Sequence, residues 1–104
     1  MKEGDVVIVP MPQADGKLKG RPAIILREMP PFRDLLICSV STQLWQVVKD
    51  FDELISPNEA DFAASELKEE SLIRLGFLAV IPRSKIVGSI GSISSERRKR
   101  LVQR

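Results

Sequence analysis

Apolar residues along the chain gather in short runs that glycine, proline or charged residues interrupt. Runs of this length between turn-forming residues predict β-strands. The clearest strands are expected at residues 6–9, 23–26 and 35–40. Pro10 is expected to end the first of them. Weaker strand candidates lie at 52–55, 71–74, 79–81 and 86–93, the last of them as a bent edge strand.

Two helical segments are predicted in the second half of the chain. A single helical turn is expected at residues 61–67. Ser94 or Ser95 is expected to cap a terminal helix that continues to Arg104. Glu96 lies near the positive end of this helix and Arg104 near its negative end, which favours the helix.

The apolar runs are too continuous for an open sheet with one face in water. They predict a mainly β (α+β) fold in which the sheet curls into a small barrel that carries a C-terminal helix. A chain of 104 residues buries roughly 65 % of its unfolded surface, enough for one core. Because no repeat or linker interrupts the sequence, we expect a single domain over residues 1–104.

Missing residue types restrict the possible chemistry. The chain has no histidine, no tyrosine and one cysteine, Cys38, which is expected to be buried as a small hydrophobe. Without imidazole, the sequence offers no basis for a zinc site, a catalytic triad or two-histidine ribonuclease chemistry. Any catalysis must rest on Arg, Lys, Ser, Thr, Asp or Glu, and neither a metal ion nor another cofactor is expected.

A cytoplasmic location is expected for three reasons. The sequence begins with polar residues, unlike a signal peptide. No apolar run approaches the about 20 residues of a membrane span. A single cysteine cannot form an internal disulfide.

Charge is distributed unevenly. Residues 50–70 hold eight acidic side chains against one lysine, whereas seven of the eight charged residues from 83 onward are basic. The overall net charge of +2 is too small to predict a nucleic-acid binder. The charge pattern by itself favours a solvated acidic loop and a solvated basic helix face over residues 97–100. Arg74 could pair with the acidic stretch or contact a substrate.

Arg21 and Pro22 stand where a flexible basic loop enters the second strand. Proline fixes its own backbone and biases the preceding residue toward an extended conformation, so Arg21 is expected to project from a rigid strand base. Its guanidinium could clamp a phosphate through two parallel hydrogen bonds. The alternative is an ordinary surface arginine.

Hydroxyl and amide residues close the third strand. Strand alternation places Ser39 and Ser41 on one face and Thr42 on the other, with Gln43 following. These groups could orient a phosphodiester or a ribose beside the arginine, or they could be ordinary strand-end residues. Trp45 could stack on one base or cover the core.

Taken in order, the segments "GDVVIVP", "RPAIIL", "ICSVSTQ", "DFAASELKEESLIR" and "SKIVGSIGSIS" resemble the MazF/PemK-like toxins of bacterial type II toxin–antitoxin modules. The resemblance extends over nearly the whole chain. It implies an SH3-like barrel of the MazF/CcdB type, usually a homodimer. It also implies metal-independent endoribonuclease cleavage of single-stranded RNA, often mRNA, with a cognate antitoxin protein as inhibitor. DNA binding is expected only for the toxin–antitoxin complex.

The resemblance also implies roles for individual residues. Arg21 matches the family's catalytic arginine before proline, and Ser41 matches its catalytic hydroxyl residue two places before a glutamine, here Gln43. That hydroxyl residue is more often threonine. The acidic residue that some members carry in the first loop is matched by Gly16, and no acidic residue stands two positions after Arg74, so no general base is identified.

The implied ribonuclease activity suggests a mechanism and further RNA contacts. In the hypothetical mechanism, the 2′-hydroxyl of the RNA attacks the adjacent phosphate while Arg21 neutralises the developing charge. Lys17 and Lys19 of the first loop are expected to hold backbone phosphates. Gln43, Trp45 and Arg74 are the other predicted RNA contacts.

Two alternatives come from different functional classes. One is a non-catalytic barrel of the same shape that poisons a protein target such as DNA gyrase, which an RNA-cleavage gel would separate from a ribonuclease. The other is an inactive toxin relative that serves as a binding partner, for which expression would cause no growth arrest.

Overall fold

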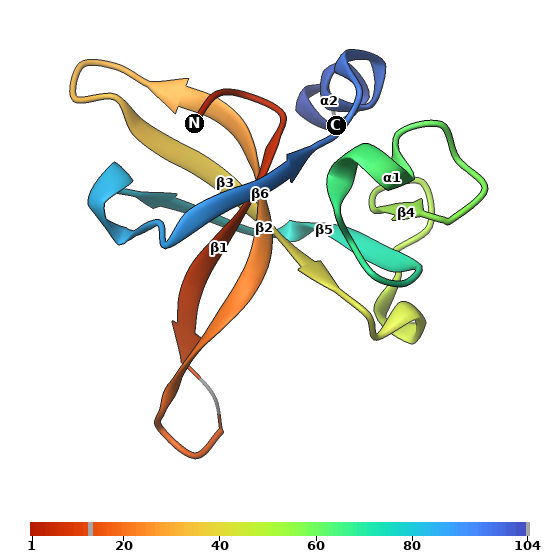
Figure 1. Ribbon diagram of the computed structural model, residues 1–104, viewed down its shortest axis with the longest axis horizontal. Helices are drawn as coiled ribbons and strands as arrows, with labels where there is room; N and C mark the ends of the chain where they lie inside the picture. The colour runs from red at the N-terminus through yellow and green to blue at the C-terminus, as the bar shows by residue number, and fades with distance from the viewer. Residues whose placement is uncertain (13, 104) are drawn as a thin grey trace.

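The structure is a computed structural model that describes residues 1–12 and 14–103. Gln13 of the first loop and Arg104, the predicted end of the terminal helix, lie outside the described residues. Figure 1 shows the strands β1 (Asp5–Pro12), β2 (Leu18–Met29), β3 (Asp34–Ser41), β4 (Glu53–Ile55), β5 (Ser71–Ile81) and β6 (Gly88–Ser92). The helices are α1 (Phe62–Ser65) and α2 (Ser95–Val102), with 3₁₀ turns at η1 (Leu44–Gln46) and η2 (Arg83–Lys85).

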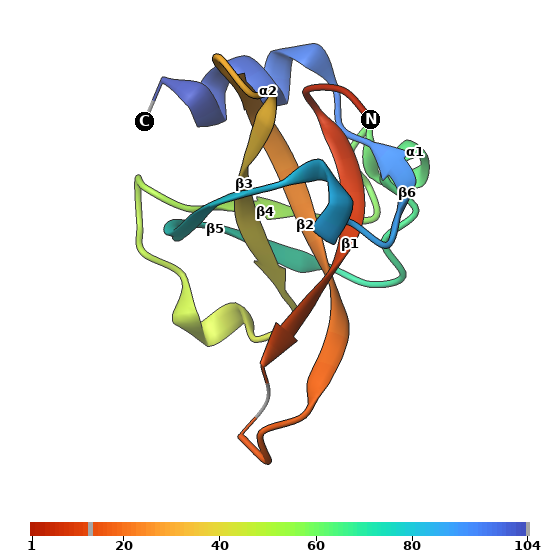
Figure 2. The same ribbon diagram turned by 90° about the vertical axis from the view of Figure 1, so that its left-hand side faces the viewer.

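The six strands form one strongly curled antiparallel sheet in the order β4-β5-β3-β2-β1-β6. Helix α2 lies across one end of the sheet, and α1 lies beside the end of β6 (Figures 1 and 2). The predicted fold class is therefore confirmed as a mainly β, small barrel-like sheet with a C-terminal helix. No helix within the described residues is long and apolar enough to cross a bilayer.

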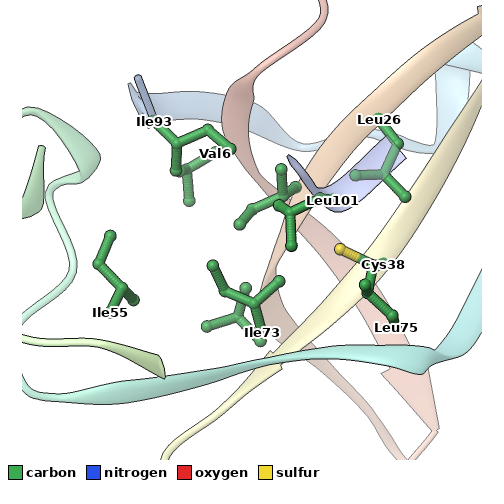
Figure 3. Close-up of a cluster of buried hydrophobic side chains, with 10 residues drawn as sticks. Val6, Leu26, Cys38, Ile55, Ile73, Leu75, Ile93 and Leu101 are labelled. Atoms are coloured by element: carbon green, nitrogen blue, oxygen red, sulfur yellow. The ribbon is translucent and has the colours of Figure 1, made fainter. Parts of the chain in front are cut away.

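The long apolar runs arise because the central strands are buried on both faces. On β1, Val6 belongs to one hydrophobic core and Val7 to a second, and Ile24 and Ile25 of β2 divide in the same way. Figure 3 shows the first core, which Leu101 of α2 joins. Strand alternation therefore supplies two cores from one sheet.

Strand β1 passes through Pro10 and ends at Pro12, so the prediction that Pro10 ends it was wrong. Among the described residues, pairing of β1 with β6 stops at Ile8, and the residues of β1 beyond this point pair with β2 alone. A strand that is paired on one side tolerates a residue without an N–H group. The continued pairing makes β1 and β2 a two-stranded hairpin arm, which projects from the sheet in Figure 1.

The two strands predicted at 71–74 and 79–81 are one continuous strand, β5. Its pairing with β3 shifts register, because Arg74 is opposite Ser39 whereas Leu78 is opposite the preceding residue, Cys38. The extra residues on β5 form an irregularity that the sequence pattern read as a gap between strands.

Strand β2 is much longer than the predicted 23–26, because it begins at Leu18, inside the predicted loop, and ends at Met29. The other predicted elements are present with smaller differences in length. Strand β4, helix α1 and the edge strand β6 lie inside the ranges expected for them. Ser94 caps α2, and its side chain accepts a hydrogen bond from the Arg97 backbone N–H at 3.1 Å.

Arg97 of α2 is buried and lies at the centre of an ion-pair network. Its Nε atom donates to Asp61 Oδ2 at 2.8 Å, and its Nη1 atom donates to Glu53 Oε1 at 3.0 Å. Glu59 accepts from the Nη2 atom. A buried guanidinium requires carboxylate partners. The network therefore joins α2 to the acidic segment, residues 50–70. The predicted solvated basic helix face and solvated acidic loop are therefore wrong for these four residues.

The network also sets the charge state at the start of α1. Burial raises the pKa of Asp61, but hydrogen bonds from the Arg97 side chain and the Ser94 backbone outweigh burial and hold this pKa below its usual value. The carboxylate is the form that accepts both hydrogen bonds. The segment that precedes α1 is thereby fixed to the start of α2.

Candidate functional site

A groove opens where β2 and β3 separate. Pairing between the two strands begins with Ala23 opposite Ser39. Before Ala23, β2 follows β1 into the hairpin arm, while β3 continues beside β5 to the pair of Ser41 and Leu72. The resulting groove has a volume of about 750 Å³, and residues of β1, β2, β3, β5 and β6 line it.

Arg21 lines this groove from the β2 side. It is an exposed residue opposite Val9 of β1, and Pro22 follows it at the point where pairing with β3 begins. Its backbone is therefore part of a paired strand, as the Arg21-Pro22 pattern predicted. A guanidinium on a strand is positioned more precisely than one on a loop.

Ser41 lines the same groove from the β3 side, as the last residue of that strand. It is half-buried, and its Oγ atom accepts a hydrogen bond from the Gln43 backbone N–H at 3.1 Å. This bond turns the chain at the end of the strand and fixes the position of the hydroxyl oxygen. The O–H group can then donate to a ligand, and Gln43 also lines the groove.

Arg74 is a third predicted residue that the fold brings to the groove. It is half-buried on β5 and lies opposite Ser39 in the register. Lys68 lines the groove as well, so three cationic side chains face it. Glu66 and Glu69 line the groove too, so among its described lining residues the cations exceed the anions by one, which favours an anionic ligand.

Three of the predicted RNA-binding residues are not among the residues that line the groove. Lys17 precedes β2 and Lys19 lies on it, both exposed on the hairpin arm, and the Lys17 backbone N–H donates to Asp15 Oδ1 at 2.9 Å. Trp45 lies on η1 and is 79 % exposed, so it does not cover the core. Base stacking by Trp45 stays a prediction.

One wall of the groove, formed by residues 66–69 after α1, was not predicted from the sequence. This wall carries Glu66, Lys68 and Glu69, all of them exposed. Their sequence pattern is that of a solvated charged loop. Only the path of the chain from α1, beside β6, to the start of β5 brings them to the groove.

Cys38 is fully buried, which confirms its predicted role as a small hydrophobe. Burial raises the pKa of its thiol to about 12, so it stays protonated at neutral pH and is a poor nucleophile. Among the described residues, no group of three or more acidic or cysteine side chains is arranged to hold a metal ion.

Comparison with known proteins agrees with this architecture. A family model described as the PemK-like, MazF-like toxin of type II toxin–antitoxin systems matches residues 2–104. A search of curated proteins finds no match. Because the family model spans essentially the whole chain, the protein belongs to the PemK-like, MazF-like toxin family of type II toxin–antitoxin systems.

Proposed function

We propose that this toxin is an endoribonuclease that cleaves single-stranded RNA, including mRNA, without a metal ion. The observation that carries the proposal is the position of Arg21 and Ser41 on opposite strands of one groove, at the point where those strands separate. A phosphodiester in this groove could contact a guanidinium from one side and a hydroxyl from the other.

The proposed reaction is an attack of the RNA's own 2′-hydroxyl on the adjacent phosphorus. The P–O5′ bond breaks, which leaves a 2′,3′-cyclic phosphate on one product and a 5′-hydroxyl on the other. The phosphorane-like transition state gains negative charge on its non-bridging oxygens. Arg21 neutralises this charge through parallel hydrogen bonds, and Ser41 donates a further hydrogen bond.

The proposed substrate is single-stranded because the attacking 2′-oxygen must align with the leaving 5′-oxygen, which a regular duplex prevents. Arg74, Lys68 and Gln43 line the groove and would contact the sugar–phosphate backbone on either side of the cleaved bond. Lys17 and Lys19 would hold phosphates that run along the hairpin arm, and Trp45 would stack on a base outside the groove.

The family implies an antitoxin protein as a partner. We infer that an acidic segment of this antitoxin occupies the groove, because the same cations that attract RNA attract carboxylates. We further propose that only the toxin–antitoxin complex binds DNA. The proposed location of this complex is the cytoplasm. We also propose a homodimer, since Leu78 and Val80 of β5 are exposed apolar residues outside the groove that a second copy could cover.

Cleavage of an unstructured RNA in the presence of EDTA tests the proposed reaction. The expected products carry 2′,3′-cyclic phosphate and 5′-hydroxyl ends, as mass spectrometry would identify. The matched control is the same RNA annealed to its complement, which should resist cleavage. Intact RNA, or products with 3′-hydroxyl ends, would contradict the proposal.

A further inference from the structure

The proposed reaction needs a group that accepts the proton of the attacking 2′-hydroxyl. The chain has no histidine, and the thiol of Cys38 is buried away from the groove. A carboxylate is ionised at neutral pH and can accept a proton, whereas a protonated lysine ammonium cannot. Among the described residues that line the groove, the carboxylates are Glu66 and Glu69.

Glu66 stands at a fixed turn at the end of α1. Its backbone adopts the left-handed conformation with φ of 60°, and its N–H donates to the Ala63 carbonyl at 3.2 Å. The preceding residue, Ser65, is fully buried. The Ser65 Oγ atom donates to the Phe62 carbonyl at 2.6 Å and accepts from the Leu67 N–H at 3.2 Å. Three hydrogen bonds therefore fix the backbone on both sides of Glu66.

Helix α1 is in turn packed closely on β6. A Cβ atom on Gly91 would lie 2.3 Å from the Ala64 carbonyl oxygen and 2.6 Å from the Ser65 carbonyl carbon, so only glycine permits this approach. Gly91 pairs with Val6 of β1. These contacts connect the turn at Glu66 to β1, the strand that pairs with the arginine-bearing part of β2.

The other end of α1 is anchored as firmly. Asp61 accepts hydrogen bonds from the Arg97 side chain at 2.8 Å and from the Ser94 backbone N–H at 3.0 Å. Because α1 is fixed at both ends, the backbone of Glu66 has a defined position beside the groove, which is what a rigid scaffold supplies to a functional residue. The Glu66 side chain is exposed and lines the groove, so it is accessible to a substrate.

We propose that Glu66 is the general base of the toxin, an assignment that rests on the proposed endoribonuclease function. The Glu66 carboxylate takes the proton from the 2′-hydroxyl as the new P–O2′ bond forms. The P–O5′ bond breaks, and solvent water supplies the proton to the leaving 5′-oxygen. Glu66 then returns its proton to water, so the enzyme is regenerated without a further reactant.

Glu69 is the rival for this role. It lies three residues further along, next to Lys68 and just before β5 begins at Ser71. The Ser71 side chain donates to the Glu69 backbone carbonyl at 2.8 Å, which holds the chain at the strand entry. No comparable helix-end anchoring is present there among the described residues. We assign Glu69 to the wall of the groove and not to proton transfer.

Single-turnover cleavage of an unstructured RNA in EDTA, followed from acidic to neutral pH, tests the assignment. Glu66→Gln is nearly isosteric and should lower the rate by about 10²–10⁴-fold. If Glu66 is the base, the wild-type rate is expected to fall at acidic pH, and Glu66→Gln should abolish that fall. Added formate should partly restore cleavage to Glu66→Ala. A merely structural role for Glu66 would produce neither the altered pH profile nor the rescue.

Glu69→Gln and Arg21→Ala provide the matched comparisons. Glu69→Gln should keep the fall in rate at acidic pH. If Glu69→Gln loses that fall while Glu66→Gln retains it, or if Glu66→Gln cleaves at the wild-type rate, the assignment of Glu66 is wrong. If Arg21→Ala also cleaves at the wild-type rate, the proposed function itself fails, so the two failures are distinguishable.

Discussion

At the scale of single residues, the site depends on where a strand ends. Ser41 is the last residue of β3, and its hydroxyl oxygen already accepts a hydrogen bond from the Gln43 N–H. The family resemblance predicted catalytic roles for Arg21 and Ser41 because their neighbours, Pro22 and Gln43, form local patterns, and the fold brings both residues to one groove. Glu66, which we propose as the general base, has no such neighbouring pattern, so the sequence alone did not suggest it.

Replacement of Ser41 tests the role of the hydroxyl. Ser41→Ala should lower the single-turnover cleavage rate by about 10²–10³-fold, as the loss of one preorganised donor does. Ser41→Thr should cleave at least as fast as the wild type, because the added methyl group restricts the rotamers of the hydroxyl. Equal rates for Ser41→Ala and the wild type, with unchanged melting temperatures, would exclude this residue from the mechanism.

At the scale of elements, the sequence pattern predicted most strands but misjudged where they stop. Pro10 did not end β1, because one side of the strand was no longer paired beyond Ile8. Arg97 did not face solvent, because the acidic segment folds over it. Both errors have the same physical origin. Whether a strand continues or a side chain is buried depends on contacts with residues distant in sequence, and local sequence propensity contains no information about those contacts.

The close contact between α1 and β6 gives a prediction at this scale. Gly91→Ala should lower the free energy of unfolding by about 1–3 kcal/mol, because the added methyl group would overlap the Ala64 carbonyl. Gly88→Ala in the same strand is the matched control, since nothing lies within 4 Å of a Cβ at that position. Urea denaturation measures both. Equal effects of the two substitutions would contradict the packing described for α1.

At the scale of the whole molecule, the sign of the net charge says little about the function. The formal charge is +2, yet the acidic segment neutralises part of the C-terminal helix through Arg97 and Arg100. Arg21 and Arg74 instead line the groove. The mainly β fold with its terminal helix was predictable from the pattern of apolar runs. The groove was not predictable in this way, because it depends on where β2 and β3 diverge and on the position of residues 66–69.

The proposed cleavage of RNA depends most directly on the guanidinium of Arg21. The decisive measurement is the single-turnover rate of RNA cleavage in EDTA by Arg21→Ala, compared with Arg27→Ala, which removes an exposed arginine of the same strand outside the groove. We expect Arg21→Ala to lose at least about 10²–10³-fold in rate and Arg27→Ala to cleave like the wild type. Cleavage by Arg21→Ala at the wild-type rate would contradict the proposed role of this arginine and with it the proposed function.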